Sequence, residues 1–115
     1  MSAYGPAFFI KRIDEKEIEK VEQDKLLEMV REISKLLKIK DEDNRLASAR
    51  FYDYNNYEPK SIGFLMFSSH IWGMMPENIQ KDQSEADAKK ILKIGKEIDK
   101  IIPKTYQYLC YYIET

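Results

Sequence analysis

The clearest pattern along the chain is a stripe of apolar side chains between residues 26 and 37. Its members are Leu26, Met29, Val30, Ile33, Leu36 and Leu37. Most of them are three or four residues apart, which places them on one face of an α-helix, because a helix turns once in about 3.6 residues. The stripe therefore predicts an amphipathic helix with this face buried.

Polar residues indicate where this helix starts. Asp14 is followed three residues later by Glu17, which resembles a capping box that satisfies the free backbone N–H groups of a first helical turn. We expect the helix to begin near residue 15. Ile18 and Val21 extend the stripe backwards with a small phase slip, which predicts a bend or break near residues 23 and 24.

A second stripe predicts a second helix in the last third of the chain. Ser84 and Asp87 precede it as polar start signals, and Pro103 ends it, because proline disfavours helical backbone in the residue before it. The members of this stripe are Ile91, Ile94, Gly95, Ile98, Ile101 and Ile102.

Four segments rich in aromatic and β-branched residues predict strands: 7–13, 46–54, 61–72 and 105–113. The first follows the turn-prone pair Gly5 and Pro6, and the middle two are joined by a short span typical of a hairpin. The resulting order, β-α-β-β-α-β, is that of a ferredoxin-like α+β sandwich, which has an antiparallel sheet and two helices on one face.

The strands predict a second apolar face on this sheet. Residues 61–76 carry no charge, and apolar side chains occupy both faces of the third strand. We assign Gly63, Leu65 and Phe67 to the helix side, because a glycine there leaves room for a closely packed helix. Ile62, Phe64 and Met66 then lie on the open side, and the tyrosine-rich last strand repeats the pattern.

Large exposed apolar patches are rare on monomers, so the open face is expected to be covered. We expect a protein partner, a second copy in a homodimer or a ligand. The alternatives are that the termini or loops of the chain itself cover this face, or that its tyrosines tolerate solvent. The candidate binding residues are Phe9, Arg50, Tyr52, Phe64, Met66, His70, Trp72, Tyr106 and Tyr108.

Composition narrows the class of protein. A length of 115 residues fits one domain, 1–115, and the 19 basic and 20 acidic residues give a net charge of -1. Nucleic-acid binding is not expected, since it draws much of its affinity from basic surface. The single cysteine, Cys110, and the lack of a long apolar segment favour a soluble cytoplasmic protein that does not enter a membrane.

The residues offer little for catalysis. His70 is the only histidine, so a two-histidine metal site is excluded. Ser68, which shares a strand face with His70 at a spacing of two, lacks an orienting acid and an oxyanion hole. Cys110 lies in an aromatic segment and is expected to behave as a small buried hydrophobe. We therefore expect no catalytic set, no metal and no cofactor.

The segment 60–67, KSIGFLMF, resembles the third-strand signature of the RNA-recognition motif, and FFIKRI at 8–13 resembles that family's first-strand signature. The resemblance implies a base-stacking platform on Phe9 and Phe64. Ser61 and Ile62 depart from the family pattern, one replacing a glycine and the other a stacking aromatic.

Two main functions remain after these exclusions. The first is a non-enzymatic interaction module that binds another protein, or another copy of itself, through its aromatic sheet face or through the segment HIWGMM at 70–75. The alternative is a dimeric α+β barrel that binds or transforms a small molecule, with Arg50, Tyr52, His70 and Trp72 at its cavity. Binding of single-stranded RNA is the lesser alternative.

Overall fold

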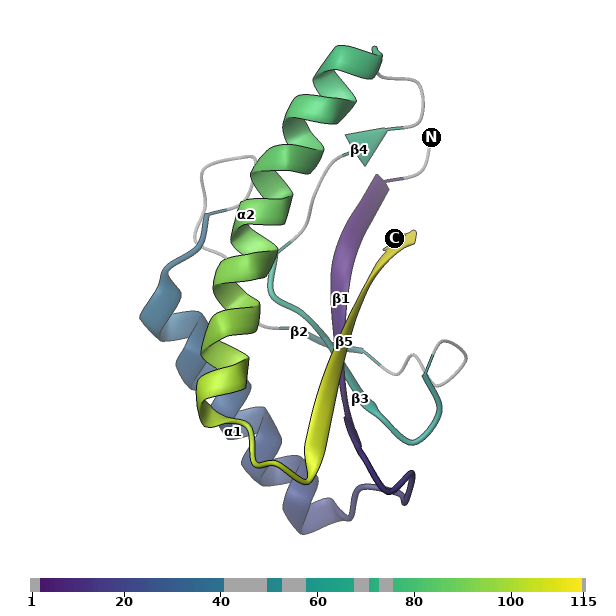
Figure 1. The fold of residues 1–115 in the computed structure, drawn as a ribbon, viewed down its shortest axis with the longest axis vertical. Helices are drawn as coiled ribbons and strands as arrows, with labels where there is room; N and C mark the ends of the chain where they lie inside the picture. The colour runs from purple at the N-terminus through teal and green to yellow at the C-terminus, as the bar shows by residue number, and fades with distance from the viewer. Residues whose placement is uncertain (1–2, 41–49, 53–57, 68–70, 73–75, 115) are drawn as a thin grey trace.

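The computed structural model of the chain describes residues 3–40, 50–52, 58–67, 71–72 and 76–114. Within these residues the chain is α+β, with two helices and an antiparallel sheet (Figure 1). The elements are, in order, β1 (Ala3–Arg12), α1 (Lys20–Leu37), β2 (Arg50–Tyr52), β3 (Ile62–Leu65), β4 (Ile71–Trp72), α2 (Glu77–Ile101) and β5 (Tyr106–Glu114).

β1 is the central strand of the sheet. It pairs antiparallel with β5 along one edge, from Tyr4 opposite Glu114 to Arg12 opposite Tyr106. Along its other edge it pairs with β3 and, nearer its start, with β4. β2 pairs antiparallel with β3. Among the described residues the sheet thus has five strands, of which β2 and β4 have only three and two residues.

The expected third strand, 61–72, is divided into β3 and β4, with residues 68–70 outside the described part of the chain. The ladder between β1 and β3 ends at Ala7, and the ladder to β4 resumes at Tyr4. Pro6 lies in this interruption. Because proline has no backbone N–H to donate, a gap in the ladder lets it lie inside a strand, where a turn was expected.

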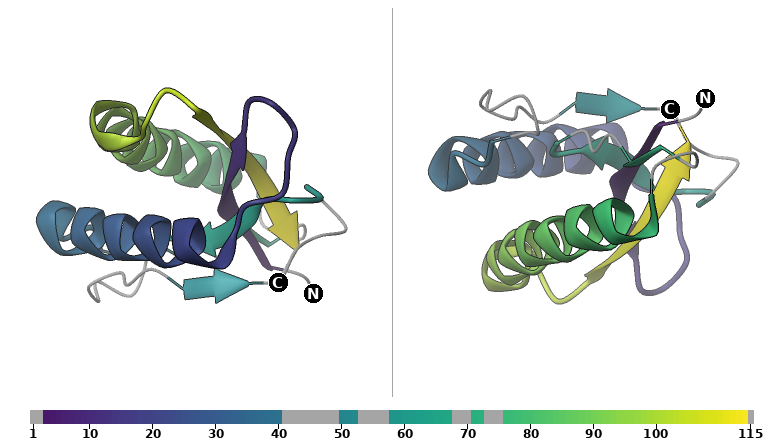
Figure 2. Two further views of the ribbon diagram at one scale, coloured as in Figure 1. Left: turned by 90° about the horizontal axis from the view of Figure 1, so that it is seen from below. Right: turned by 90° about the horizontal axis from the view of Figure 1, so that it is seen from above.

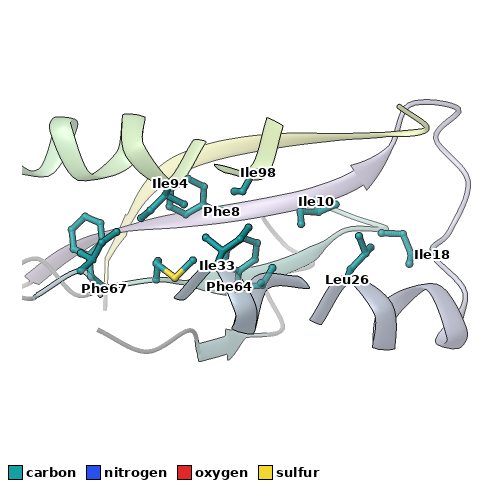
Figure 3. Packing of buried hydrophobic residues seen from close by; sticks show 12 residues of the cluster. Phe8, Ile10, Ile18, Leu26, Ile33, Phe64, Phe67, Ile94 and Ile98 are labelled. Carbon is teal, nitrogen blue, oxygen red and sulfur yellow. The ribbon is translucent and has the colours of Figure 1, made fainter. Parts of the chain in front are cut away.

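The two helices run antiparallel along the same side of β1 and β5 (Figures 1 and 2). The main core lies between them and the sheet (Figure 3). Phe8 and Phe64 are cross-strand partners whose rings stack with centroids 5.6 Å apart. Ile33 of α1 and Ile98 of α2 are 2% and 0% exposed, which confirms the predicted buried faces of both helices.

The expected assignment of the β3 side chains to the two faces is wrong. Phe64 and Met66 are buried in the core beneath the helices, with Ile62 packed against it, and Leu65 belongs to the opposite face. The register explains this, because Phe64 pairs with Phe8, whose side chain points to the helices, and paired residues share a face. The glycine that allows close helix packing is Gly95 of α2, against Tyr108.

Phe67 lies beyond the end of β3 and is also buried in the helix-side core. The ammonium group of Lys90 lies over the Phe67 ring in a cation–π contact, with its nitrogen 5.0 Å from the ring centroid. Phe67 therefore lies on its expected side, whereas Leu65 does not.

The second face of the sheet, which points away from the helices, is buried at its centre. Ala7, Phe9 and Leu65 form a separate buried cluster, exposed by 0%, 0% and 4%. The Tyr111 ring lies 5.8 Å from that of Phe9, and the Tyr111 hydroxyl donates to Glu58 at 2.7 Å. Cover by the chain itself, the alternative to a partner, therefore accounts for these three side chains.

Both helices begin at other residues than expected. α1 starts at Lys20, and the backbone N–H of Glu19 is 3.5 Å from the Glu22 carboxylate that accepts its hydrogen bond. Asp14 instead accepts from the backbone N–H of Lys16 and belongs to the turn after β1, where Glu15 has a φ of 63°. α2 starts at Glu77, directly after Pro76.

The predicted stripes include residues that are not buried. In addition, α1 is one continuous helix without the expected break. Leu36 is 68% exposed and Ile101 is 44% exposed, while Val21 is 64% exposed at the start of α1. Leu36 and Ile101 lie at the margins of the buried faces of their helices, whereas Val21 lies on the side of α1 opposite Val30, because nine residues make two and a half helical turns. Spacing alone cannot show how far the covering layer extends.

Candidate functional site

A groove lies between the first half of α1 and the turn that joins α2 to β5. It has a volume of about 460 Å³. Figure 1 shows the start of α1 and the end of α2 at the same end of the molecule. The lining side chains are Glu22, Lys25, Leu26, Met29, Ile101, Pro103, Thr105 and Tyr106.

One wall of the groove is polar and fully bonded. Arg12 and Tyr106 are cross-strand partners on β1 and β5, and Glu22 reaches them from the first turn of α1. Arg12 Nη1 donates to Glu22 Oε2 at 3.0 Å, and the Tyr106 hydroxyl donates to the same carboxylate. The rest of the guanidinium binds both carboxylate oxygens of Asp14, at 2.9 and 2.7 Å. Three elements are therefore fastened together at this point.

The pKa values of Glu22 and Tyr106 in this wall are both shifted away from neutral pH. The Tyr106 hydroxyl and the Arg12 guanidinium, which donate to the Glu22 carboxylate, lower the pKa of Glu22. Burial, together with the bond to Glu22, raises the pKa of Tyr106. Neither group would exchange a proton near pH 7, so this cluster is suited to holding structure rather than to general acid–base chemistry.

The other wall of the groove is apolar and accessible. Leu26 is buried at its base, Met29 is half-buried, and Ile101 and Pro103 are exposed beside them. Lys25 is exposed at the rim and has no bonded partner among the described residues. The groove can therefore take an apolar side chain and pair a carboxylate next to it with Lys25.

A second hollow, of about 240 Å³, lies at the turns next to β1 and β3. Lys11, Lys16 and Lys60 line it, together with Glu58. Glu58 is already bonded, because Lys11 Nζ is 3.4 Å from its Oε2 and Tyr111 donates to its other oxygen. The Lys60 ammonium donates to the backbone carbonyl of Glu15 at 3.2 Å.

Asp87 is a fully buried carboxylate on α2 that the sequence had indicated only as a helix-start signal. Gln83 Nε2 donates to its Oδ1 at 3.1 Å, and the Tyr112 hydroxyl donates to its Oδ2 at 3.3 Å. Burial raises the pKa of Tyr112, so its hydroxyl stays a donor at neutral pH. The bond from Tyr112 ties the middle of α2 to β5.

Cys110 shows the behaviour expected for a half-buried thiol. It packs against the helix-side core, and burial raises the pKa of its thiol to about 11. A thiol with such a pKa is almost entirely protonated at neutral pH and is a poor nucleophile.

The expected binding residues do not form one surface. Phe9 lies on the second face and is fully buried, while Phe64, Met66, Tyr106 and Tyr108 lie on the helix side. The expected stacking platform of Phe9 and Phe64 is therefore wrong, because the two rings lie on opposite faces of the sheet. The homodimer surface built on Phe64 and Met66 is wrong for a different reason, because both side chains are buried in the core beneath the helices.

The side chains of the other predicted binding residues are not among those that the structure describes. Arg50 and Tyr52 are the end residues of β2 and Trp72 ends β4, but their side chains and the whole of His70 lie outside the described residues. In the part of the chain that is described, no group of three or more potential metal ligands comes together. No described helix is both long and apolar enough to cross a membrane.

The groove was missed because its residues were assigned to buried stripes. Ile101 continues the spacing of Ile94 and Ile98, and Met29 that of Leu26. Pro103 was a signal for Ile101, because proline ends α2 there, and no segment among the described residues covers the last helical turn.

No protein-family model, curated protein or solved structure matches this chain.

Proposed function

We propose that the chain is a small non-enzymatic domain that binds another protein through the groove between α1 and the α2–β5 turn. The observation that carries this proposal is the contrast between the two walls. The polar wall is internally bonded, whereas the apolar wall leaves Met29 and Ile101 accessible next to Lys25, which has no bonded partner within the described part of the chain. An apolar side chain of the partner, followed by a carboxylate, complements this arrangement.

We also propose that the arrangement is ferredoxin-like. In support, the strands lie in the order β2, β3, β1, β5, every pair is antiparallel, and both helices lie on one side. β4 is then an addition that continues the β3 edge along β1. Many functions occur on this arrangement, so the proposed function depends on the groove and not on the fold.

The barrel alternative has less support. Two sheets that enclose a cavity need a free sheet face, but Ala7, Phe9 and Leu65 are already buried within the single chain. The RNA alternative would need its aromatic platform, and Phe64 is in the helix-side core.

Affinity capture with matched variants tests the proposal. The tagged full chain is used to capture proteins from a lysate of its own cells, in parallel with Ile101→Lys and Leu36→Lys. Both positions are exposed apolar residues in or near the last turn of a helix, where lysine is tolerated, so the two changes are alike in local cost.

We expect at least one protein to be held by the wild type and by Leu36→Lys and to be lost from Ile101→Lys. The purified partner should then bind with the same order of affinities in titration. Equal retention by all three chains, or a small molecule recovered at one equivalent with no protein, would contradict the proposal. Circular dichroism of each variant checks that the fold is retained.

A further inference from the structure

The solvent-facing side of α2 carries a row of lysines, Lys89, Lys93, Lys96 and Lys100, which we call the lysine ridge. Their spacing of four, three and four residues places them in one line along the helix, about 16 Å long at 1.5 Å per residue. All four are exposed, and the buried residues Ile94 and Ile98 lie on the opposite side of the helix.

The ridge is largely without counter-charge. Lys100 pairs with Glu97 at 3.0 Å, but Lys89, Lys93 and Lys96 have no bonded partner among the described residues. Residues 88–104 contain six lysines and two carboxylates, in a chain whose net charge is -1. Charge is thus concentrated locally on this face.

The stability of α2 does not explain why these four lysines lie in one row. Basic residues interact favourably with the helix dipole only within the last turn, which includes Lys100 but not the other three. Lysines four apart on a helix repel one another, so neither the pair Lys89 with Lys93 nor the pair Lys96 with Lys100 stabilises α2 by itself. A partner that supplies negative charge would remove this repulsion.

The exposed apolar side chain of Leu92 indicates which kind of partner fits the lysine ridge. It is 66% exposed and lies one turn from both Lys89 and Lys96, so a large apolar side chain is placed among the charges. A nucleic-acid backbone offers no apolar contact for it, and the ridge has no aromatic side chain on which a base could stack. A protein surface can supply carboxylates and an apolar contact together.

We propose that the lysine ridge, with Leu92, binds an acidic segment of a protein partner. This proposal rests on the proposed function and adds the chemistry of the partner to it. Lys100 and Ile101 are consecutive, so the ridge ends where the groove begins, and one partner can occupy both.

The test uses a fluorescently labelled, helix-forming synthetic peptide with glutamates at intervals of four, three and four residues and one leucine between them. Its anisotropy is measured with the wild type and with Lys93→Glu, Leu92→Ala and Lys81→Glu. Lys81 is an exposed lysine of the same helix outside the ridge, so Lys81→Glu changes the net charge equally. A single-stranded oligouridylate and vesicles of anionic lipid are the comparison probes.

We expect Lys93→Glu to weaken peptide binding by about tenfold or more, because like charges placed opposite each other are repulsive. Leu92→Ala should weaken it several-fold, and Lys81→Glu by less than twofold. Absence of peptide binding, equal loss in Lys93→Glu and Lys81→Glu, or tighter binding of the oligouridylate or the vesicles would overturn the proposal.

The lysate capture separates this proposal from the proposed function. If Lys93→Glu still retains proteins that Ile101→Lys loses, the groove function stands and the ridge proposal fails. Loss from both variants, with retention by Lys81→Glu, supports both proposals.

Discussion

At Gly95 the backbone of α2 lies so close to the Tyr108 side chain of β5 that an added methyl group would require the hydroxyl to shift. A Cβ atom built there would lie 2.6 Å from the Tyr108 hydroxyl oxygen and 3.4 Å from the ring carbon that carries it. The tyrosine and the glycine are therefore complementary, and the hydroxyl is the atom that excludes any larger residue.

Gly95→Ala should lower the free energy of unfolding, although alanine is the better helix former. Overpacking costs about 1–3 kcal/mol, and most of this range lies above the gain of roughly 1 kcal/mol from replacing a helical glycine. Urea unfolding of Gly95→Ala in the wild type and in Tyr108→Phe measures this. Removing the hydroxyl should abolish most of the loss; an equal loss in both backgrounds would mean that the hydroxyl is not the obstacle.

At the scale of elements, α1 is joined to both β1 and β5 through Glu22. The carboxylate accepts from Arg12 and Tyr106, and these bonds lower its pKa in the folded chain. A lowered folded-state pKa means that the folded state binds the proton more weakly than the unfolded state. The resulting stabilisation is complete above the ordinary pKa of 4.5 and is lost as the pH falls through the lower folded-state value.

Glu22→Gln should therefore make stability less sensitive to acid. The wild type is expected to lose stability on acidification from about pH 5 to pH 3, and the variant to lose less over the same range. Thermal unfolding across this range measures the difference. Glu28→Gln, an exposed carboxylate on the same helix, is the control and should follow the wild type; if Glu22→Gln also follows it, Glu22 does not couple the three elements.

At the scale of the whole molecule, the sheet contributes buried side chains to both of its faces. Phe8 points to the helices and Phe9 to the second face, and both are 0% exposed. The small cluster of Ala7, Phe9 and Leu65 therefore acts as a second core beside the main one. This is the physical reason why apolar residues follow one another along β1 and β3 without alternating with polar ones.

Phe8→Ala and Phe9→Ala should each destabilise the chain by about 3–5 kcal/mol, as truncation of a buried phenylalanine does. If the second face were open to solvent, only Phe8→Ala would be costly. Chemical denaturation of the two variants decides between these outcomes.

The sequence by itself determined the elements whose signal is local. Periodic apolar spacing located both helices and identified Ile33 and Ile98 as buried, and aromatic and β-branched segments located β1, β3 and β5. Pro103 marked the end of α2 to within one residue of the expected position, because its effect on the preceding backbone is local. The α+β class follows from these elements.

Only the tertiary structure decided which face each strand residue occupies and which stripe residues remain accessible. A strand segment that is apolar on both faces has no alternation to orient it, so the side of Phe64 depends on its pairing with Phe8. Ile101 has the same spacing as the buried isoleucines and is exposed because none of the described elements covers the last turn of α2. The start of α1 packs against β1 and β5, which brings together Glu22, Arg12 and Tyr106. Because these elements are far apart in sequence, the spacing of residues along the chain cannot predict that contact.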